Sequence, residues 1–389
     1  MVLFPGGFLW GTATAAHQVE GGNWNNDWWA WEHDPASPCV EPSGDACDHY
    51  HRYLEDLGLL ASLGFNAYRF SLEWSRIEPE EGEFSQAALG HYRRMVEACR
   101  EGGLEPVVTL HHFTTPRWVA DRGGWADPAT AGRFARFAAA AADALADEVR
   151  WVCTINEPNI LATMGYLTGL FPPGERDPER HRRAQGVLAA AHRRAVEVVR
   201  RAIPEAAVGL TLAMSDYQAA EPGGEATLEA LRDSDEGPLL EAAAAGDFVG
   251  VQAYSRIRVG RAGPLGPPRG AEQTLMGWEF YPEALEAAVR RAHRETGLPV
   301  LVTENGVAVA DDTRRVEYVR RALEGVGRCL ADGVPVRGYC YWSALDNFEW
   351  ALGYGPTFGL IEVDRQSLQR RPRPSAGWLG AVARANALS

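Results

Sequence analysis

The sequence predicts an α/β fold, a single (β/α)8 TIM barrel. Three observations support this prediction: eight short apolar runs along the chain, amphipathic stretches between them, and a length of 389 residues. Runs that are almost continuously apolar and rich in Val, Leu and Ile are typical of buried parallel strands. Such strands alternating with helices favour a barrel. A doubly wound sheet is the alternative, but no G-x-G-x-x-G follows any of the runs.

The eight runs are the expected barrel strands, in chain order. They are FLWGTAT (8–14), AYRFSLEW (67–74), EPVVTLHH (105–112), RWVCTINE (150–157), AVGLTLAM (207–214), DFVGVQAY (247–254), PVLVTENG (299–306) and VRGYCYWS (336–343). The stretches between them have helical spacing, and several end in glycine-containing stops just before the next strand. Helices are expected in 53–64, 85–103, 129–147, 183–204 and 314–333.

We expect one catalytic domain, residues 1–389, because the chain has no long linker rich in Pro, Gly or Ser. It also has no internal repeat at a fixed period. The stretch VGRAGPLGPPRG (259–270) is interpreted as a loop within that domain.

Composition excludes several classes of function. The formal net charge is −14, and an acidic surface repels phosphates, so neither nucleic acid nor an anionic membrane is an expected partner. The chain contains no lysine, and all 38 basic residues are arginine. Schiff-base lysines, a pyridoxal phosphate anchor and a Walker A lysine are therefore excluded, and no cofactor is expected.

The cysteines and the N-terminus indicate a cytoplasmic protein. The six cysteines are scattered without a C-x-x-C pair, which is typical of reduced intracellular thiols. The first residues lack the basic region of a signal peptide, and no apolar run reaches membrane-spanning length. The stretch 47–51, CDHYH, could suggest a metal cluster, but we interpret it as a loop running into a helix and expect no metal site.

Polar and aromatic side chains crowd the ends of the expected strands, where the active sites of such barrels lie. A purely structural barrel does not need them. They are His17, Gln18, Glu20, Arg69, Glu73, Trp74, His111, His112, Asn156, Glu157, Gln252, Tyr254, Glu304, Asn305, Trp342, Asp346, Asn347, Phe348, Glu349 and Trp350.

Two glutamates, Glu157 and Glu304, end the fourth and seventh expected strands. Strands three apart in an eight-stranded ring face each other obliquely across the mouth, so two carboxylates there can flank one substrate bond. Paired carboxylates are the apparatus of glycoside hydrolysis. The alternative for each is a solvated or ion-paired carboxylate. The pair needs different pKa values, and Arg69 and Tyr254 could hold one carboxylate ionised; a core ion pair with Glu73 is the alternative for Arg69.

Tryptophan is abundant, with 13 residues, and its positions support a sugar ligand. Sugar rings lay their C–H faces on aromatic rings, while their hydroxyls need polar partners. Core packing is the alternative for any single tryptophan. Those expected near the mouth are Trp24, Trp28, Trp29, Trp31, Trp74, Trp118, Trp278, Trp342 and Trp350.

These motifs resemble glycoside hydrolase family 1, the retaining β-glucosidases and β-galactosidases, over nearly the whole chain. The matching segments occur in family order: FLWGTATAAHQVEGG, GFNAYRFSLEWSRIEP, TLHHFTTPRW, TINEPN, MGWEFYPEAL, LVTENG and YWSALDNFEWALGY. One such motif would be moderate evidence, whereas the ordered set is strong.

The resemblance implies a role for each matching residue. Glu157 would be the general acid/base, and Glu304 the nucleophile that forms a covalent glycosyl-enzyme. Arg69 and Tyr254 would orient Glu304 and keep it charged. The remaining residues would bind the substrate: Asn156 at the sugar 2-hydroxyl, Gln18, His112, Glu349 and Trp350 at the outer hydroxyls, Trp342 as the stacking floor and Trp278 on the aglycone side.

The chain departs from the family pattern at a few positions. Phe113 stands where the family often has Trp, and Gln252-Ala253-Tyr254 replaces Asn-Tyr-Tyr. Phospho-glycosidases of the family replace the Glu of NFEW and bind the 6-phosphate with a lysine and a serine. Glu349 and the absence of lysine therefore favour an unphosphorylated O-glycoside.

We therefore expect a retaining exo-β-glycosidase that acts on small β-D-glucosides or oligosaccharides, with β-galactosides or β-fucosides as side activities. A 6-phospho-β-glycosidase, a non-catalytic sugar-binding barrel and a barrel lyase or aldolase are the alternatives. The last class usually needs a lysine or a metal. The natural aglycone and the oligomeric state stay open.

Overall fold

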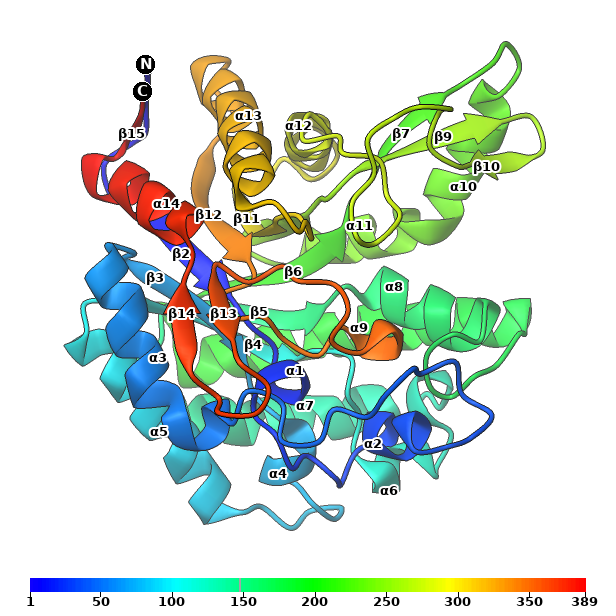
Figure 1. Ribbon diagram of the computed structural model, residues 1–389. Coiled ribbons are helices and arrows are strands. Elements are labelled where there is room, and N and C mark those ends of the chain that lie inside the picture. Colours follow the sequence, from blue (N-terminus) through cyan, green and yellow to red (C-terminus); the bar gives the residue numbers. More distant parts are fainter. Residues whose placement is uncertain (147) are drawn as a thin grey trace.

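Eight parallel strands form a closed barrel in the computed structural model, which describes residues 1–146 and 148–389 (Figure 1). Each of the eight expected strands is present. Around the ring they are β2 (Leu9–Ala13), β3 (Ala67–Ser71), β4 (Glu105–His111), β5 (Trp151–Asn156), β6 (Ala207–Ala213), β8 (Phe248–Gln252), β11 (Val300–Asn305) and β12 (Val336–Trp342). β12 pairs with β2, from Gly338 opposite Leu9 to Trp342 opposite Ala13, and this pairing closes the ring.

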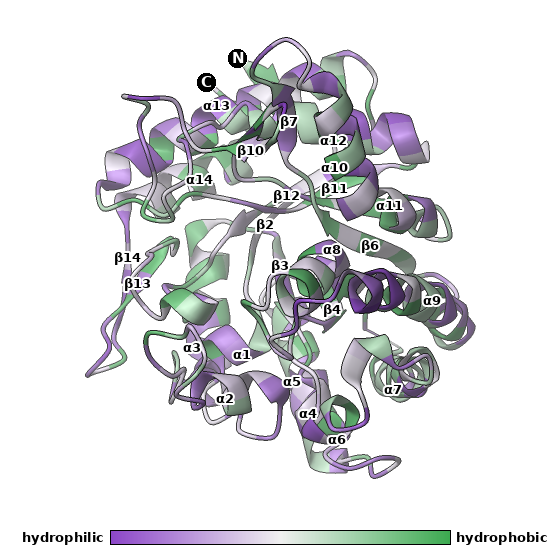
Figure 2. Cartoon of the chain, turned by 90° about the vertical axis from the view of Figure 1, so that its right-hand side faces the viewer, coloured by the Kyte–Doolittle hydropathy of each residue, from purple (hydrophilic) through white to green (hydrophobic). Residues whose placement is uncertain are grey.

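Helices surround the barrel, and each follows a strand of the ring (Figure 1). Figure 2 shows their amphipathic character: α9 has a long hydrophilic side, whereas strand β6 is largely hydrophobic. The outer helices are α3 (His49–Leu63), α5 (Gln86–Glu101), α7 (Thr130–Leu145), α9 (Pro178–Ala202), α10 (Glu225–Asp235), α11 (Gly237–Ala243), α12 (Ala284–Thr296), α13 (Asp312–Ala331) and α14 (Pro374–Ala385).

Side chains at the helix ends explain where several helices begin and end. Ser85 accepts a hydrogen bond from the Ala88 amide at the start of α5, and Asp177 does the same for two amides of α9. Gly64 ends α3 with φ 101°, and Gly297 ends α12 with φ 70°. Glycine tolerates this left-handed backbone at helix ends, so the expected glycine stop is confirmed for α3. The helix α12 was not among those expected.

Shorter elements connect the barrel units and join the chain ends. β1 (Val2–Leu3) pairs with β15 (Ala387–Leu388), so the two ends of the chain lie side by side (Figure 1). The remaining short elements are α1 (Ala16–Val19), α2 (Asp27–Glu32), α4 (Trp74–Ile77), α6 (Arg117–Ala120), η1 (Gly124–Ala126), α8 (Pro158–Ala162), the π-helical turn η2 (Thr163–Leu167), η3 (Trp350–Leu352), β13 (Ile361–Val363) and β14 (Arg370–Pro372).

A second, three-stranded sheet was not expected. It consists of β7 (Asp216–Ala219), β9 (Arg256–Gly260) and β10 (Gly263–Leu265). β9 and β10 form an antiparallel hairpin, so the interpretation of 259–270 as a loop is wrong for its first part. β7 lies in the connection after β6, and β9 lies in the connection after β8. The parallel pairing of β7 with β9 therefore holds these two connections together.

The inside of the barrel changes from apolar to polar along its axis. One apolar layer consists of Leu9, Ala67, Val107, Cys153, Phe248 and Leu301. Successive side chains of a strand point to opposite faces, so Arg69 points inward two residues after Ala67 on β3. Arg69 is fully buried, and it marks the level at which the barrel interior becomes the floor of a site.

Two further expectations concern membrane-spanning segments and the stretch 47–51, which contains Cys47. No helix in the described part of the chain is both long and apolar enough to cross a membrane. The stretch 47–51 is a loop running into a helix, as expected, because α3 begins at His49. His49 contacts Asp56 through Nδ1, at 2.8 Å, within that helix.

Candidate active site

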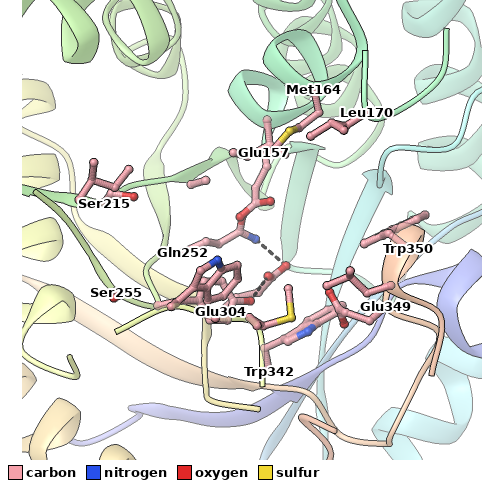
Figure 3. A pocket seen from close by; sticks show the side chains of 18 of the residues that line it. Glu157, Met164, Leu170, Ser215, Gln252, Ser255, Glu304, Trp342, Glu349 and Trp350 are labelled. Carbon is pink, nitrogen blue, oxygen red and sulfur yellow. Dashed lines mark hydrogen bonds between the residues drawn. The ribbon is translucent and has the colours of Figure 1, made fainter. Parts of the chain in front are cut away.

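A cavity with a volume of about 730 Å³ opens where the barrel strands end. Glu157, Glu304, Trp342, Glu349 and Trp350 line it together (Figure 3). These residues come from β11 and β12 and from the segments that follow β5 and β12. The cavity therefore lies at the carboxyl end of the barrel, where the sequence predicted a site.

Glu157 stands directly between β5 and α8. Its φ of 40° and ψ of 57° are left-handed, a region that residues other than glycine seldom occupy and that often occurs at functional sites. Pro158 takes the first helical position, which suits its fixed φ and missing N–H. Pro158 therefore begins α8 just after the extended backbone of β5 has ended.

Glu304 lies on β11, three strands around the ring from β5. The register of β11 with β8 shifts between Val302 and Glu304, which brings Glu304 opposite Gln252. Such an irregularity can redirect a side chain at a barrel rim. Glu304 Oε1 accepts hydrogen bonds from Arg69 Nη1 at 2.6 Å and from Gln252 Nε2 at 2.7 Å. Tyr254 Oη donates to the other oxygen, Oε2, at 2.6 Å.

Arg69 is paired with Glu304, so the alternative of an ion pair with Glu73 is wrong. Glu73 instead accepts hydrogen bonds from Asn23 at 2.6 Å and from Thr114 at 2.9 Å. Arg69 also donates to Asn156 Oδ1 at 2.5 Å. Its guanidinium thus holds two acceptors at the level of the cavity floor, in the fork geometry that suits arginine.

The two glutamates have different electrostatic surroundings. Burial and the nearby charge of Glu304 raise the pKa of Glu157 well above its usual range, and Arg69 only partly opposes this. Burial raises the pKa of Glu304 overall, although the Arg69 charge and the hydrogen bonds from Tyr254 and Arg69 oppose this rise. The surroundings of Glu157 therefore favour its protonated form more strongly than those of Glu304 do.

Asn156 and Gln252 form a second layer of contacts with this pair. Asn156 Oδ1 accepts from Gln252 Nε2 at 2.7 Å as well as from Arg69. With its oxygen engaged, the amide nitrogen of Asn156 is buried and has no partner among residues 1–146 and 148–389. Buried donors normally have partners, so this N–H₂ group is available to an acceptor on a ligand.

Gln252 is a functional candidate that the sequence reading did not assign. Its substitution for the family's Asn was noted only as a departure, yet its amide donates to both Glu304 and Asn156. Figure 3 shows Gln252 between Glu157 and Glu304. Its position at the end of an apolar strand was the available signal, because a polar side chain buried there needs partners.

The predicted sugar-binding residues lie at different depths. Gln18, on α1, donates to the Phe348 carbonyl at 2.8 Å, and its Oε1 is buried without a partner in the described structure. His112 lines the cavity with its ring against Trp342 and Trp350, at centroid distances of 5.8 and 6.1 Å. Burial and Arg69 lower the pKa of His112 well below its usual range. The neutral ring offers one donor and one acceptor.

Glu349 adds another carboxyl to the cavity. Burial and the neighbouring Glu304 raise the pKa of Glu349 to about 8. Its Oε2 accepts from Asn347 Nδ2 at 3.3 Å. The raised pKa favours the protonated form of this carboxyl near neutral pH, and hydroxyl donors of a ligand would favour its ionised form.

Five of the nine tryptophans predicted near the mouth divide into two groups. Trp342, Trp350 and Trp278 line the cavity, and Trp278 lies 5.6 Å from the ring of Tyr254. Trp74 and Trp118 are buried against each other at 6.1 Å instead of lining the cavity. Their expected place near the mouth is therefore wrong, because core packing accounts for them.

His111, which was predicted at the end of a strand, lies outside the cavity. It packs against Trp125, at 5.0 Å, and Phe134, at 6.0 Å. Burial lowers the pKa of His111 to about 3. Over the described residues, no group of three or more His, Cys, Asp or Glu side chains is arranged to hold a metal ion.

Comparison with known proteins is consistent with this geometry. The model of glycosyl hydrolase family 1 matches residues 2–259 and 265–388. The bifunctional beta-D-glucosidase/beta-D-fucosidase of Bifidobacterium breve is 34% identical over 447 residues, which cover 97% of each protein.

Solved structures agree over the whole fold. The crystal structure of the beta-glycosidase BGL167 is 48% identical, with a TM-score of 0.93, covering 99% of this chain and 98% of that one. The beta-glucosidase from Thermotoga maritima in complex with glucoimidazole is 31% identical, with a TM-score of 0.94, covering 99% of this chain and 100% of that one.

Proposed function

The chain belongs to glycosyl hydrolase family 1 and is a glycoside hydrolase of the β-glucosidase type, and we propose that it is a retaining exo-β-glucosidase for unphosphorylated β-D-glucosides. One observation carries the proposal: Glu157 and Glu304 share one cavity, but only Glu304 is held by Arg69 and Tyr254. This asymmetry suits two different tasks for the two carboxyls.

In the first step, Glu304 is the nucleophile. Its carboxylate attacks the anomeric carbon and forms a covalent bond to the sugar, while the bond from that carbon to the glycosidic oxygen breaks. Glu157 gives its proton to the departing oxygen, so the aglycone leaves as a neutral alcohol. Retention requires the two carboxyl groups to lie roughly 5–5.5 Å apart.

In the second step, Glu157 acts as the base. It is now ionised, and it takes a proton from a water molecule whose oxygen attacks the anomeric carbon. The bond to Glu304 breaks, and the sugar leaves with its β configuration restored. The raised pKa of Glu157 supports both roles, since the same group must give a proton and then accept one.

The remaining residues are proposed to hold the sugar. The free amide nitrogen of Asn156 supports a contact with the 2-hydroxyl. Gln18, His112, Glu349 and Trp350 are assigned to the outer hydroxyls, and their unpaired buried atoms or cavity position support this. Trp342 is the stacking floor, and Trp278 is assigned to the aglycone side.

Several observations support an unphosphorylated glucoside. Glu349 lines the cavity, and the sequence has no lysine, so a 6-phosphate would meet a carboxyl and no ammonium group. A relative is named for both glucosidase and fucosidase activity, which supports β-fucosides as a side activity. We propose β-galactosides as substrates of a further side activity.

The deciding experiment follows the configuration of the product. Wild-type enzyme is incubated with 4-nitrophenyl β-D-glucoside, and proton NMR reads the first anomer released. We expect the β anomer. The α anomer would refute retention, and no turnover would favour the non-catalytic sugar-binding barrel. Faster turnover of the 6-phosphate of the same substrate would favour the phospho-glycosidase alternative.

A further inference from the structure

The cavity has two parts of different chemistry. Around the glutamate pair it is polar, with Asn156, Gln252 and Tyr254 all hydrogen-bonded at the floor. The outer part lies between the second sheet and the segments after β5 and β12, and most of its side chains are apolar. They include Met164, Leu170, Leu265, Trp278 and Leu352.

Four large apolar side chains of this outer part are exposed at the mouth. Their exposed fractions are 43% for Leu170, 46% for Leu265, 38% for Trp278 and 44% for Leu352. They come from four separate segments of the chain. Apolar side chains that gather around the rim of a pocket, and do not pack away, mark a binding surface. This surface is continuous with the catalytic cavity.

Three polar residues of the same wall, Ser255, Arg256 and Glu279, are already engaged with one another. Arg256 donates to both oxygens of Glu279, at 2.9 and 2.7 Å, and to Gln218 Oε1 at 2.8 Å. Ser255 Oγ donates to the Glu279 carbonyl at 2.7 Å. Among the polar side chains of this wall, Ser215 and Arg258 remain for the hydroxyls of a second sugar. A buried hydroxyl without a partner weakens binding.

Part of the apolar wall lies on the same side of the cavity as Glu157. Figure 3 shows Met164 and Leu170 on the side of Glu157 that faces away from Glu304. Met164 belongs to the π-helical turn η2, shortly after Glu157 in the chain. The group that takes the proton of Glu157 is thus next to thioether and hydrocarbon surface.

We propose that this outer part binds an extended apolar aglycone, an alkyl or aryl group, in preference to a second sugar. The inference rests on the proposed function, since it concerns the leaving group of the same reaction. Each methylene that moves from water to this surface and becomes fully buried should raise the binding affinity roughly fourfold. A sugar of similar size would lose hydrogen bonds to water that the wall does not replace.

The test compares kcat/KM for methyl β-D-glucoside, hexyl β-D-glucoside and cellobiose. Methanol and hexanol are leaving groups of nearly equal acidity. The ratio of kcat/KM for hexyl β-D-glucoside to kcat/KM for methyl β-D-glucoside therefore reports on binding of the aglycone. We expect hexyl β-D-glucoside to exceed methyl β-D-glucoside by at least about 30-fold, which corresponds to partial burial of the five added methylenes. We also expect it to exceed cellobiose.

Substitutions locate the surface. Leu265→Ser and Leu170→Ser remove exposed side chains that no core packing requires, and each should lower the hexyl-to-methyl ratio by about three- to tenfold. Leu54→Ser is the matched control, because Leu54 is 63% exposed on α3 and does not line the cavity. It should leave the ratio unchanged.

The inference and the proposed function fail in different ways. If 4-nitrophenyl β-D-glucoside is hydrolysed with retention but hexyl and methyl glucosides react equally well, the apolar aglycone is refuted and the glucosidase stands. A preference for cellobiose would refute it too. If the hexyl-to-methyl ratio is high and stays high in both Leu265→Ser and Leu170→Ser, the aglycone does not bind at this apolar surface. Absence of glucoside hydrolysis altogether would overturn the proposed function.

Discussion

Glu304 accepts hydrogen bonds from Arg69, Gln252 and Tyr254, whereas the side chain of Glu157 accepts none from the described residues. Donors favour the ionised carboxylate, and burial without donors favours the protonated one. At the scale of single residues, the different roles that we propose for two identical carboxyl groups thus rest on their neighbours.

The role of Glu304 can be tested by removing its carboxylate. Glu304→Gly should lower hydrolysis by about 10⁴–10⁶-fold, because no nucleophile remains. Added azide should enter the vacated space and produce the α-glucosyl azide, detected by NMR. Glu304→Gln is the control, since its amide fills the space and azide should not restore turnover. Failure of azide to rescue the glycine variant would count against Glu304 as the nucleophile.

The pH dependence of kcat/KM should be bell-shaped. It falls at low pH as Glu304 becomes protonated, and it falls at high pH as Glu157 loses its proton. Because the pKa of Glu157 is raised well above its usual range, activity should persist to higher pH than an ordinary glutamate would allow. Glu157→Gln should abolish the alkaline limb and lower the rate for alkyl glucosides by about 10²–10⁴-fold.

Two controls separate this assignment from other causes. A substrate with a strongly acidic leaving group, 2,4-dinitrophenyl β-D-glucoside, should lose far less of its glycosylation rate in Glu157→Gln, because its leaving group needs no proton. Glu349→Gln should keep the alkaline limb, although burial raises the pKa of Glu349 to about 8. If the alkaline limb of the pH profile disappears in Glu349→Gln, the titrating group behind that limb is Glu349 and not Glu157.

Gln252 is expected to be a positioning residue for Glu304. Gln252→Met keeps the length of the side chain but removes both donors, so kcat should fall by about 10–100-fold. The acid limb should move to higher pH, since Glu304 loses a hydrogen bond that favours its charged form. Gln218→Met, whose amide bonds to Asp216, should leave the limb in place. An unmoved limb in Gln252→Met would indicate a purely structural role.

At the scale of elements, the expected strands are confirmed because their signal is local. A run of apolar residues that is buried on both sides needs no information about its partners. The hairpin of β9 and β10 has no comparable signal: Gly263, Pro264 and Gly266 suggested a loop. Pairing with β7, at Tyr217 opposite Ile257, stabilises it, and that partner lies on another connection of the barrel.

Helix ends are a second local signal, and one of them can be measured. Ser85→Ala should lower the free energy of unfolding by about 1 kcal/mol, because the Ala88 amide loses its acceptor at 3.2 Å. Chemical denaturation measures the change. Ser62→Ala on the exposed side of α3 is the control, and it should be neutral or slightly stabilising. Equal losses in both variants would show that the Ser85 cap contributes nothing specific.

At the scale of the whole molecule, stability depends on closing the ring between β12 and β2. Gly338 lies in this seam, where an added Cβ would meet Leu9 Cβ at 2.6 Å and Leu301 Cδ1 at 2.9 Å. Gly338→Ala should lower the free energy of unfolding by about 1–3 kcal/mol through overpacking.

Gly58→Ala is the matched control for this seam. Gly58 lies within α3, and an added Cβ there meets no atom within 4 Å. The substitution should raise the free energy of unfolding by about 0.5–1 kcal/mol, because alanine loses less entropy than glycine in a helix. An unchanged Gly338→Ala variant would show that the seam tolerates a methyl group.

The sequence alone determined the eight strands, the barrel and the family, because apolar runs and ordered motifs are properties of neighbouring residues. It also identified Glu157 and Glu304 by their positions at strand ends. Only the tertiary structure decided which groups surround them. The partner of Arg69 is Glu304, 235 residues away, and not the nearby Glu73. The apolar outer wall likewise joins four separate segments, and closure of the ring is what brings such distant residues together.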